Sequence, residues 1–160
     1  MTNAFYDRAS AVDYAERWAL ARNPAYYDFS DLGGDCTNFV SQCLFAGCGV
    51  MNYSSENGWF YRGLNDRAAS WTSVNYLFQF LMTNTGPGPY ARIAERRDIV
   101  PGDVIQLGKA DGTFYHSLFV IDASPDQIYI AAHSYDALWR PITSYDAARI
   151  RYLHIHARAR

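Results

Sequence analysis

Apolar side chains in the first half of the chain recur at helical spacing in three stretches, which predicts three helices. The first begins after Asp7, a residue type that caps helices, and stops before Asn23-Pro24, because proline disfavours helical backbone at the preceding residue. The second spans about 37–46 and the third about 73–82. The apolar stripes are Val12, Ala15, Trp18 and Ala19, then Phe39, Val40, Cys43 and Leu44, then Val74, Leu77, Phe78 and Leu81.

The second half changes to short apolar runs that follow turn residues, which is the pattern of strands. The run at 114–121 is apolar on both faces and is therefore expected near the centre of a sheet. Helices followed by strands predict an α+β fold, with the N-terminal helices packed on a C-terminal antiparallel sheet. We find no repeat or boundary within 1–160, so we expect a single domain. The predicted strands are 104–107, 114–121, 128–133 and 150–155.

Two segments between these elements have no clear period. The segment 51–70 is polar and aromatic, and a loop of this length in a compact domain is often functional. We interpret it either as an irregular cover over the core or as a groove wall in which Trp59 contacts a substrate. The segment 84–89 holds three Gly or Pro residues and is predicted to be a connector.

Composition and charge exclude several classes of protein. The 160 residues are 49% hydrophobic and carry a net charge of −2, which suits a folded core and does not suit a nucleic-acid-binding surface. No apolar run approaches the ~20 residues needed to span a membrane. The first eight residues do not resemble a signal peptide. The compartment stays open, including an origin as one domain of a longer secreted or cell-surface bacterial protein.

The strongest chemical signal is a cysteine at the predicted start of the second helix. The residues Gly33-Gly34-Asp35-Cys36 lead directly into that helix. A helix N-terminus carries partial positive charge and free N–H groups, which favour a thiolate and can stabilise an oxyanion. We therefore interpret Cys36 as a nucleophile, with its own N–H and the Asp35 side chain as candidates for the oxyanion site. Cys43 and Cys48 lack a polar context and are interpreted as small apolar fillers.

A nucleophilic cysteine needs a base, and the chain offers two well-placed histidines. If Asp122 pairs with Gln127 across the turn 123–126, His116 lies opposite His133 with Cβ atoms about 5 Å apart. His116 is then the expected base and His133 the residue that orients it.

That assignment depends on strand register. A slip of one residue would place Ala132 or Ser134 opposite His116, with Asp136 or Asp122 as the orienting group. The alternative interpretation is that both histidines are structural.

Two other functions remain as hypotheses. One is a non-catalytic module that binds a glycan or peptide through the aromatic segment 53–61. The other is a metal site made by Cys36, His116 and His133, which are chemically acceptable zinc ligands. His154 and His156 share a strand face but have no carboxylate or cysteine close by in sequence. We therefore expect no metal or other cofactor.

The order of these residues resembles the papain-like NlpC and CHAP superfamily, and more closely the family named "Putative amidase domain". The resemblance covers the chain almost end to end. It rests on Tyr6-Asp7-Arg8, 11–15, Arg22-Asn23-Pro24, 31–42, Trp71, 101–105 and 132–136. It implies a papain-like fold and a cysteine amidase or peptidase that acts on an amide bond in bacterial cell-wall peptides such as peptidoglycan stem peptides. By the same resemblance, Cys36, His116 and His133 are catalytic, and Tyr26 or Tyr27 lines the site.

Overall fold

The helices form where the apolar spacing predicts them, and their ends follow from local chemistry. The computed structural model describes residues 5–159. The Asp7 carboxylate caps the first helix by accepting a hydrogen bond from the Ser10 N–H at 3.0 Å. The second helix ends at Gly49, whose φ of 72° is a left-handed conformation that glycine adopts without strain. The helices are α1 (Arg8–Trp18), α2 (Cys36–Cys48), α3 (Ala69–Thr72) and α4 (Val74–Thr83).

The strands of the second half form a six-stranded antiparallel sheet with the order β3-β8-β4-β5-β6-β7. All four predicted strands are present, and β5 lies at the centre of the sheet with β4, as expected. The strands are β3 (Gly88–Ala94), β4 (Val104–Gly108), β5 (Phe114–Ala123), β6 (Ile128–Ala132), β7 (Ala137–Pro141) and β8 (Arg149–Arg158).

Two edge strands were not expected. The connector predicted at 84–89 leads directly into β3, which pairs with β8. Strand β7 follows Ser134 and Tyr135, both of which have positive φ, so a tight reversal there brings the chain back beside β6. The pattern of apolar residues does not predict either strand, because β3 begins with glycine and proline and β7 follows two residues with left-handed backbone.

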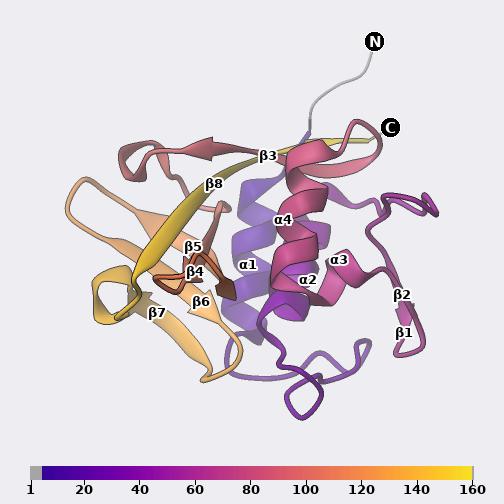
Figure 1. Cartoon of the computed structure of the whole chain (residues 1–160), viewed down its shortest axis with the longest axis horizontal. Coiled ribbons are helices and arrows are strands. Elements are labelled where there is room, and N and C mark those ends of the chain that lie inside the picture. Colours follow the sequence, from indigo (N-terminus) through magenta and orange to yellow (C-terminus); the bar gives the residue numbers. More distant parts are fainter. Residues whose placement is uncertain (1–4, 160) are drawn as a thin grey trace.

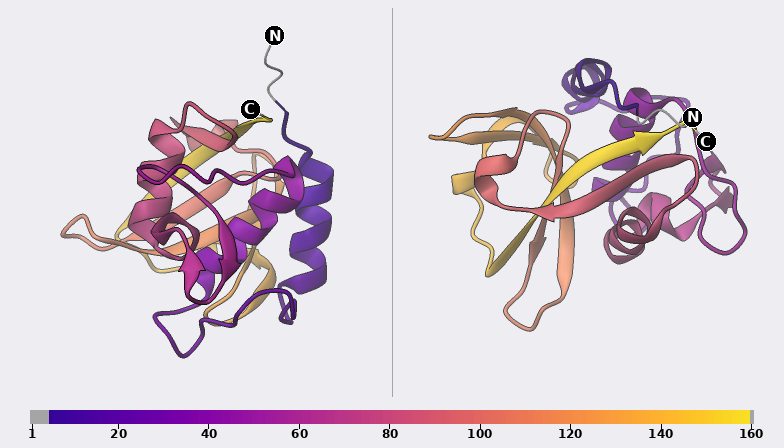
Figure 2. Two further views of the ribbon diagram at one scale, coloured as in Figure 1. Left: turned by 90° about the vertical axis from the view of Figure 1, so that its right-hand side faces the viewer. Right: turned by 90° about the horizontal axis from the view of Figure 1, so that it is seen from above.

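The helices cover one face of the sheet. Figure 1 shows α1, α2 and α4 side by side next to the sheet, and Figure 2 shows the sheet curling away from them. The fold is therefore α+β with helices on an antiparallel sheet. The irregular segment 51–70 contains the small hairpin of β1 (Tyr61–Gly63) and β2 (Asp66–Arg67) on the outer side of the helices.

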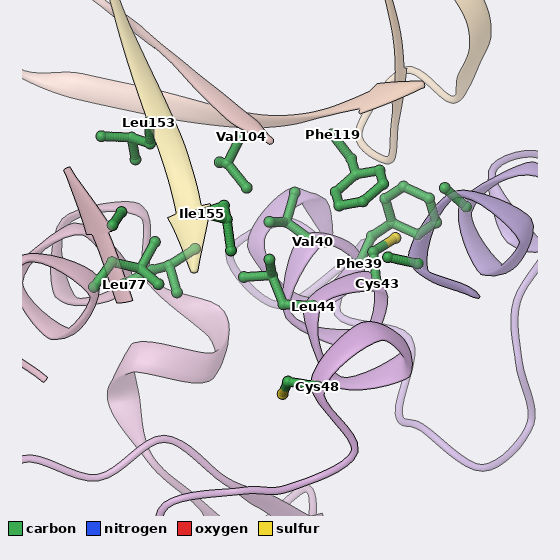
Figure 3. Close-up of a cluster of buried hydrophobic side chains, with 14 of the residues drawn as sticks. Phe39, Val40, Cys43, Leu44, Cys48, Leu77, Val104, Phe119, Leu153 and Ile155 are labelled. Carbon is green, nitrogen blue, oxygen red and sulfur yellow. The ribbon is translucent and has the colours of Figure 1, made fainter. Parts of the chain in front are cut away.

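The curled sheet separates two hydrophobic clusters. The first lies between the helices and the sheet, where Val40 and Leu44 of α2 point toward the strands (Figure 3). The second lies on the opposite face and includes Leu107, Leu118 and Ile130. Because side chains alternate along a strand, each residue of β5 belongs to one face or the other.

The predicted register of β5 and β6 is wrong by one residue. Phe119 pairs with Ala131, so the two residue numbers sum to 250, where the prediction required 249. The chain turns more tightly than expected, with the Ser124 N–H donating to the Gln127 carbonyl at 2.9 Å. A bulge at 121 shifts the register back by one residue. His116 and His133 therefore do not lie opposite each other.

Candidate active site around Cys36

Cys36 is the first residue of α2, as the sequence predicts. Its side chain is only 8% exposed. The sulfur lies 3.7 Å from the hydroxyl of Thr37 and receives a backbone hydrogen bond from Ser117 of β5. The Thr37 hydroxyl in turn lies 3.0 Å from the Ser117 hydroxyl. The thiol is thus held where the start of a helix meets the central strands.

The resting thiol differs from the sequence expectation. Burial raises the pKa of the Cys36 thiol, and this effect outweighs the hydrogen bonds from Ser117 and Thr37, which lower the pKa. The site at rest therefore holds a neutral thiol at pH 7. The position at a helix N-terminus does not by itself produce a thiolate, because the charged form must also be solvated.

This resting state gives a pH-dependent expectation. Iodoacetamide reacts with the thiolate, and a raised pKa makes the thiolate rare at neutral pH. We expect alkylation of Cys36, followed by peptide mass spectrometry, to rise about tenfold per pH unit from 7 to 9 without levelling off. Cys36→Ala measures the background from Cys43 and Cys48. A rate that already plateaus below pH 7 would show a preformed thiolate and contradict this description.

His116 is the neighbour of Ser117 in β5, and the Ser117 hydroxyl contacts Thr37 beside Cys36. The His116 ring, however, lies on the other face of the sheet. His116 pairs with Leu107 and its ring centroid lies 6.1 Å from that of Tyr145, both of which belong to the second cluster and its border. Its neighbour Ser117 faces α2. Within residues 5–159, no hydrogen bond joins the His116 ring to the Cys36 thiol. Burial and the positive charge of Arg140 lower the pKa of His116 to about 4, so the imidazole is neutral at pH 7.

His133 lies on the helix side of the sheet, beside the residue that precedes the thiol. Its Nδ1 lies 2.5 Å from a carboxylate oxygen of Asp35, and its ring stacks on Phe39 at 4.2 Å. Its Nε2 lies 2.8 Å from the carbonyl oxygen of Trp18. Both ring nitrogens thus face oxygen acceptors, although an Arg22 nitrogen also lies 3.2 Å from Nε2.

The Asp35 carboxylate is fully buried and engaged on both oxygens. One oxygen accepts hydrogen bonds from the Phe29 N–H at 2.8 Å and from Asn38 at 2.9 Å. The other accepts from His133. Both oxygens of Asp35 therefore already have partners within the protein, which argues against the predicted contribution of its side chain to an oxyanion site. Asp35 and His133 hold the loop that precedes Cys36 in place.

Arg22 and Asp136 close this network at the surface. Arg22 donates two hydrogen bonds to the Asp136 carboxylate, at 2.8 and 3.0 Å, and its Nε lies 3.7 Å from Asp35. Residues more than a hundred positions apart therefore converge behind the cysteine. Asp136, the alternative orienting group, is paired with Arg22, and Asp122 is exposed on β5.

The aromatic candidates divide into one surface residue and two packed ones. Trp59 is fully buried, its ring lies 4.6 Å from that of Trp71 in a tilted arrangement, and it donates to the Ser41 hydroxyl, which argues against its expected contact with a substrate. Tyr26 packs between Tyr61 and Trp71. Tyr27 is 42% exposed, and its carbonyl accepts a hydrogen bond from Asn38, two residues after the cysteine. Tyr27 is therefore the tyrosine available at the surface near the start of α2.

A row of polar side chains that was not predicted runs from the cysteine across three strands. Gln106 of β4 pairs with Ser117 of β5 and with Arg151 of β8. Its amide nitrogen donates to the Ser117 hydroxyl at 3.1 Å, and its amide oxygen accepts from Arg151 at 2.6 and 2.9 Å. With Thr37, these side chains link Arg151 to Cys36. The sequence gives only a weak signal for this row, because the pairing of polar residues on different strands cannot be predicted without the register.

The irregular segment borders an open hollow of about 570 Å³ away from Cys36. Its aromatic lining comes from Tyr53, Phe60 and Tyr76, and Arg62 stacks over Tyr53 and Phe60 at 4.9 Å. The described residues contain no group of three His, Cys, Asp or Glu side chains arranged for a metal ion. Over the same residues, no helix is both long enough and apolar enough to cross a membrane.

The metal hypothesis fails on geometry. His116 and His133 lie on opposite faces of the sheet, so this arrangement does not bring both rings to one ion with Cys36. His154 lies 3.0 Å from the buried carboxylate of Asp103, which also accepts from Arg8 at 2.8 Å. That carboxylate therefore serves a structural ion pair.

Comparisons with known proteins show which family the chain resembles. The chain is 33% identical over 159 residues to the uncharacterized protein YhbB of Bacillus subtilis strain 168, covering 94% of this chain and 50% of YhbB. It is 29% identical to the uncharacterized protein YjcM of the same organism, covering 92% of this chain and 36% of YjcM. The chain thus spans half or less of these relatives. No solved structure matches. The family model described as "Putative amidase domain", a name that points to hydrolysis of C–N bonds, matches residues 5–155, and the chain belongs to that family.

Proposed function

We propose that this domain hydrolyses an amide bond through covalent catalysis by Cys36. The observation that carries the proposal is the position of Cys36 as the first residue of α2, where the Thr37 hydroxyl lies 3.7 Å from the sulfur and 3.0 Å from the Ser117 hydroxyl of β5. The first N–H groups of a helix have no partner within the helix and point toward the side where a substrate carbonyl would bind. The family's name supports the same reaction class.

The chemistry needs two steps. In the first, the Cys36 sulfur attacks the amide carbonyl while His116 accepts the thiol proton, and the Cys36 N–H stabilises the oxyanion. Collapse of the tetrahedral intermediate breaks the C–N bond, and the proton held by His116 passes to the leaving amine. In the second, water attacks the thioester, which releases a carboxylic acid and restores the thiol.

His116 is the proposed base although its ring lies toward Tyr145 at rest. Ser117, the next residue, faces α2 through the contact of its hydroxyl with Thr37, so a change of the backbone at the start of β5 on substrate binding is required to turn the His116 ring to the sulfur. Catalytic hydrogen bonds are often long or absent without substrate. A neutral imidazole and a neutral thiol are the correct starting forms for such a transfer. His133 takes part as a positioning residue that acts through Asp35.

The proposed substrate is a peptide or amide of the bacterial cell wall, and the proposed fold group is the papain-like NlpC and CHAP superfamily. The likeness rests on Gly33-Gly34-Asp35-Cys36-Thr37 at a helix start and on His116 at the start of an apolar strand. Tyr27, exposed beside the start of α2, is the proposed aromatic contact to the substrate.

The experiment uses muropeptides released from bacterial peptidoglycan by a muramidase. We expect the chain to produce pairs of fragments whose masses sum to a parent muropeptide plus one water. His116→Gln should lower this rate by about 10²–10⁴-fold, because it removes the base and keeps a similar volume. His156→Gln, at a partly exposed histidine stacked on Tyr90, should keep the rate. Equal rates for both variants would exclude His116 as the base.

A second candidate function is binding without catalysis. The hollow beside Tyr53, Phe60 and Tyr76 combines aromatic rings with amide and hydroxyl side chains, which suits a glycan or a peptide. The same experiment separates the two functions. A chain that retains muropeptides but hydrolyses none of them would favour the binding module.

A further inference from the structure

We propose that Arg151 binds a carboxylate group of the substrate about 10 Å from the bond that Cys36 attacks. This proposal rests on the proposed function, because the bound molecule is a substrate only if the domain hydrolyses an amide. It assigns a specificity-determining residue that lies outside the sequence motif around the cysteine.

The Arg151 guanidinium has both faces covered. Its central carbon lies 3.5 Å from the ring centroid of Phe78 and 3.7 Å from that of Phe114. Two rings this close to one carbon cannot share a face, so they enclose the guanidinium on opposite sides. Nε and Nη2 donate to the Gln106 amide oxygen. The remaining edge, which includes Nη1, is left for a ligand.

The charge of Arg151 has no acidic partner among residues 5–159. Among the ion pairs of residues 5–159, none includes Arg151, although Arg8, Arg22, Arg62 and Arg97 are all paired with acids. Burial lowers the pKa of the Arg151 guanidinium to about 10, which reflects the cost of an uncompensated charge. A bound anion would remove that cost.

The shape of the slot selects the kind of anion. A carboxylate is planar and presents two oxygens that match the fork of a guanidinium. The two phenylalanine rings leave a flat space in the plane of the guanidinium. A tetrahedral phosphate would extend out of that plane toward the rings, so a carboxylate fits better.

The position of Arg151 relative to Cys36 sets the distance. Ser117, Gln106 and Arg151 occupy paired positions on three adjacent strands, β5, β4 and β8. Neighbouring strands lie ~4.8 Å apart, so about 10 Å separates Arg151 from Ser117 and the thiol above it. Ser117 and Gln106 are fully buried, so a bound peptide has to pass around this row, and about three extended residues are the least that covers the distance. The expected substrate thus carries an acidic group three or more residues from the scissile amide.

The test measures binding in the Cys36→Ala background, where no turnover occurs. The probes are acetyl-trialanine with a free C-terminal carboxylate and the same peptide with a C-terminal amide. We expect the carboxylate form to bind about tenfold more tightly and to shift the NMR signal of the Arg151 Nε–H. Arg151→Gln should abolish the preference, and Arg151→Lys should keep only part of it, because lysine has the charge without the fork. The exposed Arg149→Gln is the matched control and should keep the full preference.

The outcomes separate this inference from the proposed function. Equal binding of the two peptides, no shift of the Arg151 signal at millimolar carboxylate peptide, or an undiminished preference in Arg151→Gln would overturn the carboxylate site. A carboxylate preference that depends on Arg151, together with no hydrolysis of muropeptides by the wild-type chain, would keep the site and reject the amidase proposal. Thermal melting of each variant confirms that it is folded.

Discussion

Cys36→Ala should lower the rate of amide hydrolysis by about 10⁴–10⁶-fold, because removing a nucleophile abolishes the covalent route and leaves only binding and oxyanion contacts. The thiol is nearly buried, so alanine leaves the α2 start and the Ser117 strand in place. The measurement is the release of new amino groups from muropeptides, with products identified by mass.

The matched control for this change is Cys48→Ala. Cys48 is also buried, but it lies at the opposite end of α2 (Figure 3). Its sulfur donates to the Val50 carbonyl. We expect this variant to hydrolyse muropeptides at the wild-type rate. If Cys36→Ala kept more than a tenth of the wild-type rate, Cys36 would not be the nucleophile.

Asp35→Ala should lower the free energy of unfolding by about 3–5 kcal/mol, because it leaves His133 buried beside an empty space with its main acceptor gone. The Phe29 N–H and the Asn38 amide would lose an acceptor at the same time. Urea denaturation measures the change. The start of α2 should loosen, so the hydrolysis rate should fall as well.

Two comparisons show whether the effect belongs to the network. Asp66→Ala removes an exposed ion pair with Arg62 and should lower the free energy of unfolding far less than Asp35→Ala does. His133→Ala combined with Asp35→Ala should cost much less than the sum of the two single changes, since both remove the same interaction. Additive costs, or a loss below about 1 kcal/mol for Asp35→Ala, would show that the pair does not hold the loop.

The sequence predicts the layers of this fold well because spacing reports burial directly. The helix stripes at 39–44 and 77–81 each pack into one cluster, and the central run at 114–121 alternates between the two clusters, so the spacing of apolar residues reveals these elements. The register of β5 and β6 depends on finer detail. A two-residue turn at Pro125-Asp126 and a bulge at 121 act in opposite directions, and neither leaves a signal in the apolar pattern.

That single residue of register changes the interpretation of the site. With the predicted pairing, His116 and His133 would form a dyad. With the observed pairing, they lie on opposite faces, and His133 bonds to a residue 98 positions away. The position of Cys36 could be predicted because a glycine pair and a helix start are local features. The partners of Asp35 and Arg151 could not, because they assemble only when distant strands and loops meet.

The charge state of the Cys36 thiol also depends on more than its local sequence. The sequence places Cys36 at a helix N-terminus, which favours a thiolate, and the structure adds burial, which disfavours it. Burial is the larger effect here, and it raises the pKa of Cys36. The local sequence indicates that a helix N-terminus lies beside the thiol. The burial of the thiol depends on the whole fold.

The most direct test of the account is a search for the acyl-enzyme. The chain is mixed with muropeptides, quenched in acid within milliseconds to seconds, digested and analysed by mass spectrometry. The account predicts an acyl group in thioester linkage on the peptide that contains Cys36, absent from the Cys36→Ala chain. Two results would contradict it. One is hydrolysis without any such adduct, at a rate that Cys36→Ala leaves unchanged. The other is an acyl group on another residue.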